Sequence, residues 1–132
     1  MVVMEINHLF AQEHIRKWAN AWNHHDLKKI LSFYSEDILF SSPKVKLVFP
    51  DRPSATITDK RELGEYFSRG LKKFPKLHFT PVDFFLKDQI VILEYLGTPD
   101  NKIRWSVMEK FEFNTIGLVA KSNVYYGIES QV

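Results

Sequence analysis

Glu109 is the one acidic residue in an apolar row within the segment IRWSVMEKFEF, residues 103–113. A β-strand alternates its side chains between two faces, so every second residue of this segment shares a face with Glu109. The residues of that row are Ile103, Trp105, Val107, Phe111 and Phe113. If the row lines an apolar pocket, burial raises the pKa of the carboxyl group. The neutral acid can then donate a hydrogen bond to a ligand carbonyl.

Two other interpretations of Glu109 stay open at the level of sequence. The carboxylate could pair with a cationic side chain near the mouth of the pocket, such as His14, Arg16 or Arg104. Alternatively, the opposite face of the strand, residues 104–112, points inward and Glu109 faces solvent.

Two further titratable residues lie on apolar surfaces. Glu94 shares a strand face with Ile90, Ile92 and Leu96 in the segment IVILEYL. Two buried carboxyl groups could share a proton, but only if both faced the same side. We therefore expect a salt bridge at a sheet edge or dimer interface for Glu94. His14 lies on the apolar stripe of a predicted helix, where it either carries protons in the pocket or serves ordinary hydrogen bonding.

The other histidines do not form a metal-binding pattern. His24 and His25 are adjacent, while His8 and His14 are six residues apart, which is a poor spacing for one helical face. The sequence has no HxxxH motif and no recognisable cofactor motif. We expect neither a metal nor a cofactor.

Helices precede strands along the chain. Apolar residues spaced three and four apart predict a helix over residues 5–23, and Asp26 suits the N-cap of a short second helix that includes Tyr34. A strand begins near residue 38. The proline-rich segment 43–57 predicts a loop, with a short hairpin arm at residues 45–49. A third helix begins at about Asp59 and ends at or before Phe74.

The last third of the chain changes to period-two alternation. It predicts four antiparallel strands joined by short turns, at residues 77–87, 89–97, 102–113 and 118–129. Helices first and a strand meander last indicate an α+β fold, with N-terminal helices packed on a curved, mainly antiparallel sheet. At 132 residues, the chain is expected to form one domain over residues 1–132.

The composition excludes several classes of protein. Apolar residues make up 45% of the chain, which is typical of a globular domain, and the net charge of +2 is too small to indicate a nucleic-acid partner. The chain has no cysteine, no apolar stretch that approaches a membrane span and no recognisable signal peptide. We expect a cytoplasmic protein without membrane or nucleic-acid partners.

Three segments resemble the nuclear transport factor 2-like superfamily. They are WANAWNHHDLKKILSFYSEDILFSSP at 18–43, ITDKRELGEYF at 57–67 and MEKFEFNTIGLVAKSNVYYG at 108–127. This superfamily includes ketosteroid isomerases, SnoaL-like polyketide cyclases, scytalone dehydratase and limonene epoxide hydrolase. The resemblance implies a cone-shaped α+β domain with a strongly curved sheet, but many different activities occur on this fold.

Only some of the functional residues of these families have an equivalent in this sequence. Ser42 occupies the position of the general-base Asp of ketosteroid isomerases, and Trp18 occupies that of their oxyanion-hole Tyr. Glu109 occupies the position of their second oxyanion-hole residue, an Asp kept neutral by its apolar site. SnoaL-like cyclases often end the last strand with an acid, where this chain has Gly127. The usual isomerase base is therefore missing.

Two functions follow as hypotheses. In the first, a small hydrophobic carbonyl compound binds without a cofactor in a pocket where Glu109 and His14 perform isomerase-, cyclase- or dehydratase-like chemistry. The expected pocket residues are Trp18, Trp22, Phe40, Ser42, Trp105 and Tyr125. In the second, the chain is a non-catalytic binding or assembly domain that forms a homodimer through its outer sheet face. The residues expected on that face are Lys87, Tyr95, Arg104, Met108 and Tyr126.

Overall fold

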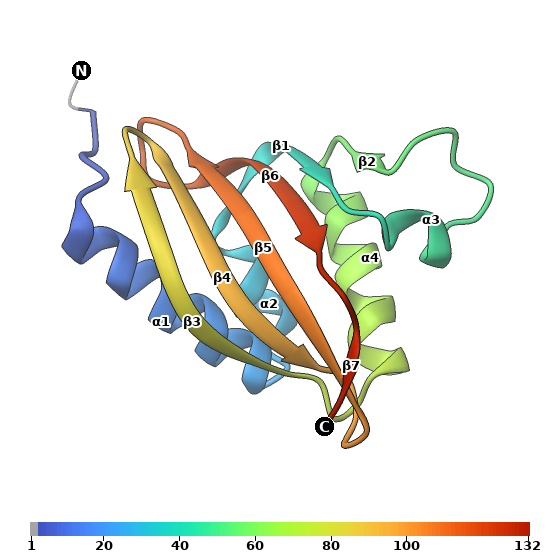
Figure 1. Ribbon diagram of the computed structural model, residues 1–132. Coiled ribbons are helices and arrows are strands. Elements are labelled where there is room, and N and C mark those ends of the chain that lie inside the picture. Colours follow the sequence, from blue (N-terminus) through green and yellow to red (C-terminus); the bar gives the residue numbers. More distant parts are fainter. Residues whose placement is uncertain (1–2) are drawn as a thin grey trace.

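A computed structural model describes residues 3–132 of the chain (Figure 1). The helices are α1 (His8–Asn23), α2 (Leu27–Leu31), α3 (Val45–Val48) and α4 (Lys60–Lys73). The strands are β1 (Tyr34–Ser41), β2 (Thr56–Ile57), β3 (His78–Lys87), β4 (Ile90–Thr98), β5 (Ile103–Phe113), β6 (Val119–Tyr126) and β7 (Ser130–Gln131). No helix among these described residues is long and apolar enough to cross a membrane.

The strands form one curved sheet in the order β2-β1-β6-β5-β4-β3, and β7 adds to the end of β5. Only the β1–β6 pair is parallel, and all other pairs are antiparallel. Figure 1 shows α1, α2 and α4 together on one face of the sheet. The predicted α+β fold, with helices packed on a mainly antiparallel sheet, is confirmed.

Local sequence signals position the helices as expected. The Asp26 side chain accepts a hydrogen bond from the Lys29 backbone N–H at 3.1 Å, so it caps α2. The Asp59 side chain accepts one from the Glu62 N–H at 2.7 Å and caps α4. α4 ends at Lys73, before Pro75, as predicted.

The segment after β1 differs from its prediction. Residues 45–49 were expected to form a hairpin arm, but Val45–Val48 is the short helix α3. The N–H of Val45 bonds to the Ser42 carbonyl at 3.0 Å, and the N–H of Phe49 bonds to the Val45 carbonyl at 2.9 Å. Because Pro43 and Pro50 flank so few residues, a local helical turn satisfies these backbone groups where a second strand would need a partner.

The boundary near Tyr34 also differs from its prediction. Tyr34 does not continue α2 but begins β1, because the Phe33 carbonyl accepts a hydrogen bond from the Val119 N–H at 2.8 Å. Pairing with β6 therefore starts four residues earlier than the predicted strand.

The phase of β5 resolves the three interpretations of Glu109. The row Trp105, Val107, Glu109 and Phe111 is buried under the helices, whereas Met108 on the alternate row is exposed. The interpretation in which Glu109 faces solvent is therefore wrong, and Glu109 forms no ion pair with a cationic side chain among residues 3–132. Glu94 pairs in register with Met108 and so faces the opposite side of the sheet from Glu109. The two carboxyl groups do not share a proton.

The predicted outer face is wrong for two of its residues. Lys87, Arg104 and Met108 lie on the outer side, but Tyr95 is buried and pairs in register with Val107 on the inner side. Tyr126 also pairs with Val107, from the other neighbouring strand. β4 carries apolar residues on both faces, so alternation alone does not show which row of this strand turns inward.

Candidate functional site

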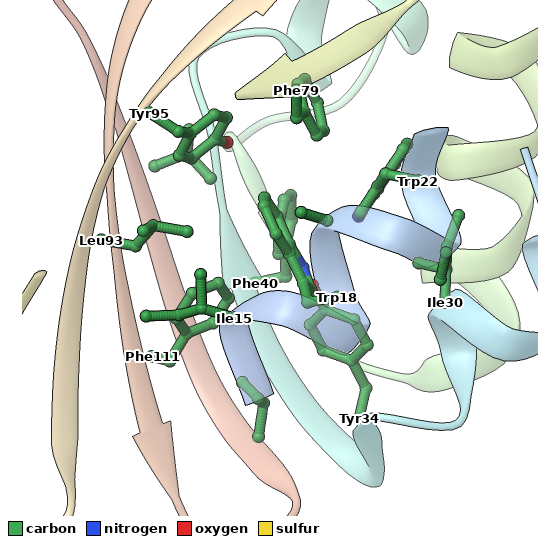
Figure 2. Close-up of a cluster of buried hydrophobic side chains, with 14 of the residues drawn as sticks. Ile15, Trp18, Trp22, Ile30, Tyr34, Phe40, Phe79, Leu93, Tyr95 and Phe111 are labelled. Atoms are coloured by element: carbon green, nitrogen blue, oxygen red, sulfur yellow. The ribbon is translucent and has the colours of Figure 1, made fainter. Parts of the chain in front are cut away.

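A cavity of about 110 Å³ opens between the concave face of the sheet, α1, α3 and α4. Eleven of its twenty lining residues carry aromatic rings, so its wall is mostly apolar. Figure 2 shows Trp18 of α1 inside this cluster, with Phe79 and Tyr95 toward the sheet and Trp22 one helical turn further along. An apolar cavity of about 150 Å³ holds a benzene molecule, so a ring bound in this smaller space extends toward the opening.

Glu109 is the only carboxylic acid among the residues that line the cavity. It is 3% exposed. The Tyr95 hydroxyl donates to its Oε1 at 2.8 Å, and the Ser122 hydroxyl donates to its Oε2 at 2.8 Å. Burial raises the pKa of Glu109 to about 7, although both hydrogen bonds act in the opposite direction. The carboxyl group is therefore poised to gain or lose a proton near neutral pH.

Four tyrosines surround this acid and also line the cavity: Tyr34, Tyr66, Tyr95 and Tyr126. Burial raises the pKa of all four phenols, and the charge of Glu109 raises each further. The pKa of Tyr66 reaches about 12, with the Ser42 hydroxyl acting to lower it. These phenols stay protonated at neutral pH, so they can act as hydrogen-bond donors but not as bases.

Trp18 has its indole N–H already engaged. Its Nε1 donates to the Tyr34 hydroxyl oxygen at 3.1 Å. A hydroxyl has one proton and two lone pairs, so the Tyr34 proton is still free to be donated. The phenol of Tyr34 therefore lies next to Trp18, the residue at the position of the oxyanion-hole Tyr, but it comes from β1 and not from the first helix. Among residues 3–132, the buried Nε1 of Trp22 has no hydrogen-bond partner, which leaves one unsatisfied donor in the cavity wall.

The mouth of the cavity combines aromatic rings with two cations. The Lys44 ammonium lies 4.1 Å from the centre of the Trp105 ring and 4.6 Å from that of Tyr126. The Lys73 ammonium lies 5.5 Å from the centre of the Phe74 ring. The Trp105 Nε1 donates to Glu129 Oε1 at 3.0 Å. Burial lowers the pKa of Lys44, Glu129 opposes this shift, and Lys73 adds to it.

Most of the predicted pocket residues line this cavity. Ser42 is buried in the wall, where its hydroxyl accepts a hydrogen bond from the Lys44 backbone N–H at 3.3 Å. The other predicted residues in the wall are Trp18, Trp22, Phe40, Trp105 and Glu109. The segment that follows β1 contributes Lys44, Leu47 and Val48 to the cavity lining.

Tyr125 and His14 do not line the cavity. Tyr125 is 57% exposed and pairs with Met108 on the outer face, while its neighbour Tyr126 points inward. The prediction chose the wrong phase of β6, which only the pairing of Glu109 with Val124 determines. His14 is buried among the rings of Phe10, Phe33, Phe111 and Phe113.

The environment of His14 argues against a role as a proton carrier. Burial lowers its pKa to about 4, with a smaller contribution from Lys17, so the imidazole is neutral at pH 7. Its Nε2 has no hydrogen-bond partner among the described residues. His14 packs against the ring of Phe111 and does not line the cavity, so the structure gives no support to a catalytic role for it.

Several site residues were missed by the sequence reasoning. Tyr34 was taken for a helical residue, Tyr95 and Tyr126 were assigned to the outer face, and Tyr66 and Lys44 were not singled out for the cavity. Tyr95 could have been identified from its strand row, which it shares with Val91 and Leu93. This row faces inward because Leu93 pairs in register with Glu109. Within residues 3–132, no three histidine, aspartate or glutamate side chains come close enough together to hold a metal ion.

Comparison with solved structures supports the architecture. A SnoaL-like protein of unknown function from Burkholderia thailandensis is 30% identical, with a TM-score of 0.85 over 95% of this chain and 100% of that chain. A protein with a ketosteroid isomerase-like fold from Catenulispora acidiphila is 14% identical, with a TM-score of 0.70 over 88% of this chain and 86% of that chain.

The epoxide hydrolase/cyclase-like enzyme SalBIII, which acts in pyran ring formation in salinomycin, is 12% identical, with a TM-score of 0.76 over 96% of this chain and 98% of that chain. At 12–14% identity, such likeness shows the fold alone. No curated protein matches the sequence at a significant level. The sequence matches the family described as the SnoaL-like domain over residues 15–121, and the chain belongs to that family.

Proposed function

We propose that the chain binds a small cyclic carbonyl compound and catalyses proton transfer at the carbon next to its carbonyl group. The observation that carries this proposal is the buried carboxyl group of Glu109 in the wall of an apolar cavity, where burial raises its pKa to about 7. A general base works best when its pKa lies near the working pH. Enolisation needs one such base and a hydrogen-bond donor for the oxygen, and no cofactor.

The residues divide this work in a simple way. The ionised Glu109 takes a proton from the α-carbon; the C–H electron pair becomes the C=C bond of an enolate, and the carbonyl oxygen takes the negative charge. Tyr34 donates its free phenol proton in a hydrogen bond to that oxygen. Return of the proton from Glu109 to carbon, at the same or a conjugated position, restores the carboxylate. Ser42 cannot act as the base, because a hydroxyl is protonated at neutral pH.

The size and polarity of the cavity limit the substrate. A volume of about 110 Å³ limits the ligand to one small ring, part of which extends through the mouth. The unsatisfied indole N–H of Trp22 favours a ligand that brings a hydrogen-bond acceptor. A cyclic ketone or lactone meets both conditions.

Deuterium exchange tests the proposal without knowledge of the natural substrate. Cyclohexanone is incubated with the protein in D₂O, and ¹H NMR follows the loss of its α-protons. We expect exchange above the buffer rate, reduced about 100-fold or more in Glu109→Gln. The matched control is Glu94→Gln, which changes a carboxyl group on the opposite face of the same sheet. Exchange that is equal in wild type and Glu109→Gln would reject Glu109 as the base.

A second candidate function, homodimer assembly, is favoured by the outer sheet face. Phe85 and Tyr125 are 60% and 57% exposed there, and Met108 pairs directly with Tyr125. Exposed apolar side chains grouped on one face are typical of an interaction surface, and a twofold homodimer is the commonest outcome.

Analytical ultracentrifugation at micromolar concentration tests this assembly. We expect a dimer that Met108→Lys converts to a monomer, while Ile116→Lys, an exposed position in the β5–β6 turn, leaves it intact. A wild type that sediments only as a monomer would reject it.

A further inference from the structure

We propose that the two lysines at the cavity mouth, Lys44 and Lys73, select a ligand that carries a carboxylate, so that the substrate is a small cyclic keto acid. This inference rests on the proposed function, because it names the substrate class of the same cavity. It adds a second recognition point, at the mouth, to the acid–base group in the wall.

The mouth holds more positive charge than its surroundings neutralise. Five ion pairs occur among residues 3–132, and neither Lys44 nor Lys73 takes part in any of them. The carboxylate of Glu129 acts on Lys44 by its charge and accepts a hydrogen bond from the indole N–H of Trp105, but it forms no ion pair with either lysine. A half-buried ammonium without a close carboxylate partner is stabilised when a ligand supplies one.

The aromatic rings fix the position of these charges. Lys44 lies over both Trp105 and Tyr126, and Lys73 lies over Phe74, whose ring meets that of Trp105 edge to face at 5.4 Å. All five side chains line the same cavity. The cations are therefore held at its rim, where a long lysine side chain would otherwise extend into solvent. A ring inside the cavity with a carboxylate one carbon away would bring that carboxylate to the rim.

The deep end of the cavity, unlike the mouth, disfavours a negatively charged ligand group. Glu109 is the acid there, and a ligand carboxylate beside it would suffer repulsion whenever Glu109 is ionised. The ligand therefore binds with its ring and carbonyl group deep in the cavity and its carboxylate at the mouth. This preference selects one orientation of the ligand. In that orientation, the α-carbon faces Glu109.

The experiment compares two probes of nearly equal shape: phenylacetate, which is anionic, and phenylacetamide, which is neutral. All three tryptophans of the chain line the cavity, so intrinsic fluorescence reports binding directly. We expect phenylacetate to bind about tenfold more tightly than phenylacetamide at low salt, and this preference to shrink in 0.5 M NaCl, as expected for partly exposed charges.

Variants assign the preference to the rim. Lys44→Met keeps the length and apolar stem of the side chain but removes its charge, and it should reduce the preference to the part that Lys73 supplies. The matched control is Lys46→Met, an exposed lysine of α3 that lies two residues after Lys44 and does not line the cavity. It should retain the preference. Glu129→Gln removes the competing acid and should tighten phenylacetate binding.

The outcomes separate this inference from the proposed function. Equal affinity for the two probes, or an equal loss of preference in Lys46→Met and Lys44→Met, overturns the selection of a carboxylate while leaving a working cavity. Failure of both probes to change the fluorescence at their solubility limit overturns the inference together with the ligand cavity itself.

Discussion

Replacement of Glu109 by glutamine should make the protein more stable at pH 8, although it removes the central group of the site. The carboxyl group of Glu109 is buried, and burial raises its pKa from 4.5 to about 7. The folded state therefore holds a proton that the unfolded state releases between these two pH values. Stability contributed by this group is fully present below pH 4.5 and is lost as the pH rises through about 7.

The size of the effect follows from the shift. A difference of about 2.5 pH units at about 1.36 kcal/mol per unit corresponds to about 3 kcal/mol of unfolding free energy. Glutamine cannot ionise, so Glu109→Gln avoids this loss. Its amide can still accept from one of the two hydroxyl groups, Tyr95 or Ser122, and donate to the other, because a hydroxyl both donates and accepts.

Urea denaturation of both proteins at pH 5 and pH 8 measures the effect. We expect similar free energies of unfolding at pH 5 and an advantage of about 3 kcal/mol for Glu109→Gln at pH 8. The difference between variant and wild type cancels the titration of all unchanged groups. A difference that stays constant with pH, or a wild type that gains relative stability at pH 8, would refute the claim that burial dominates this carboxyl group.

Two further predictions concern the core and the mouth of the cavity. The pKa of His14 is about 4 in the folded protein and 6.5 in the unfolded chain, so its contribution to stability is lost as the pH falls below 6.5. In urea denaturation, the unfolding free energy of His14→Phe relative to wild type should rise by about 3 kcal/mol between pH 7 and pH 4. A difference that does not change with pH would contradict a neutral buried imidazole. A Cβ at Gly70 would meet no atom within 4 Å, so Gly70→Ala should raise the unfolding free energy by about 0.5–1 kcal/mol. Gly70 also lines the cavity, so the larger side chain of Gly70→Leu should fill it and abolish phenylacetate binding, as measured by tryptophan fluorescence. Undiminished binding to Gly70→Leu would place the ligand elsewhere.

The sequence alone predicts the architecture well, because its periodicities follow the elements closely. The capping residues Asp26 and Asp59 and the four late strands are found within a few residues of their predicted positions. The two rows of β5 could also be separated by sequence, since one of them is apolar except for Glu109, but which row turns inward is shown only by the structure.

The composition of the site was harder to predict, because it depends on strand register and not on strand identity. Tyr125 and Tyr126 are equivalent by sequence pattern, and only the pairing of β6 with β5 shows that Tyr126 turns inward. A slip of one residue exchanges the faces of a strand. His14 was misplaced for a related reason: a helical stripe shows which residues are buried, but not whether they meet the cavity or the core on either side of it.

A carboxyl-detected ¹³C NMR titration of wild type against Glu109→Gln tests the central claim most directly. We expect one glutamate resonance, missing in the variant, with a midpoint near pH 7 that moves when cyclohexanone is added. A midpoint near 4.5 that does not respond to cyclohexanone would contradict it, and Glu109 would then be an ordinary ionised carboxylate without a role in ligand chemistry.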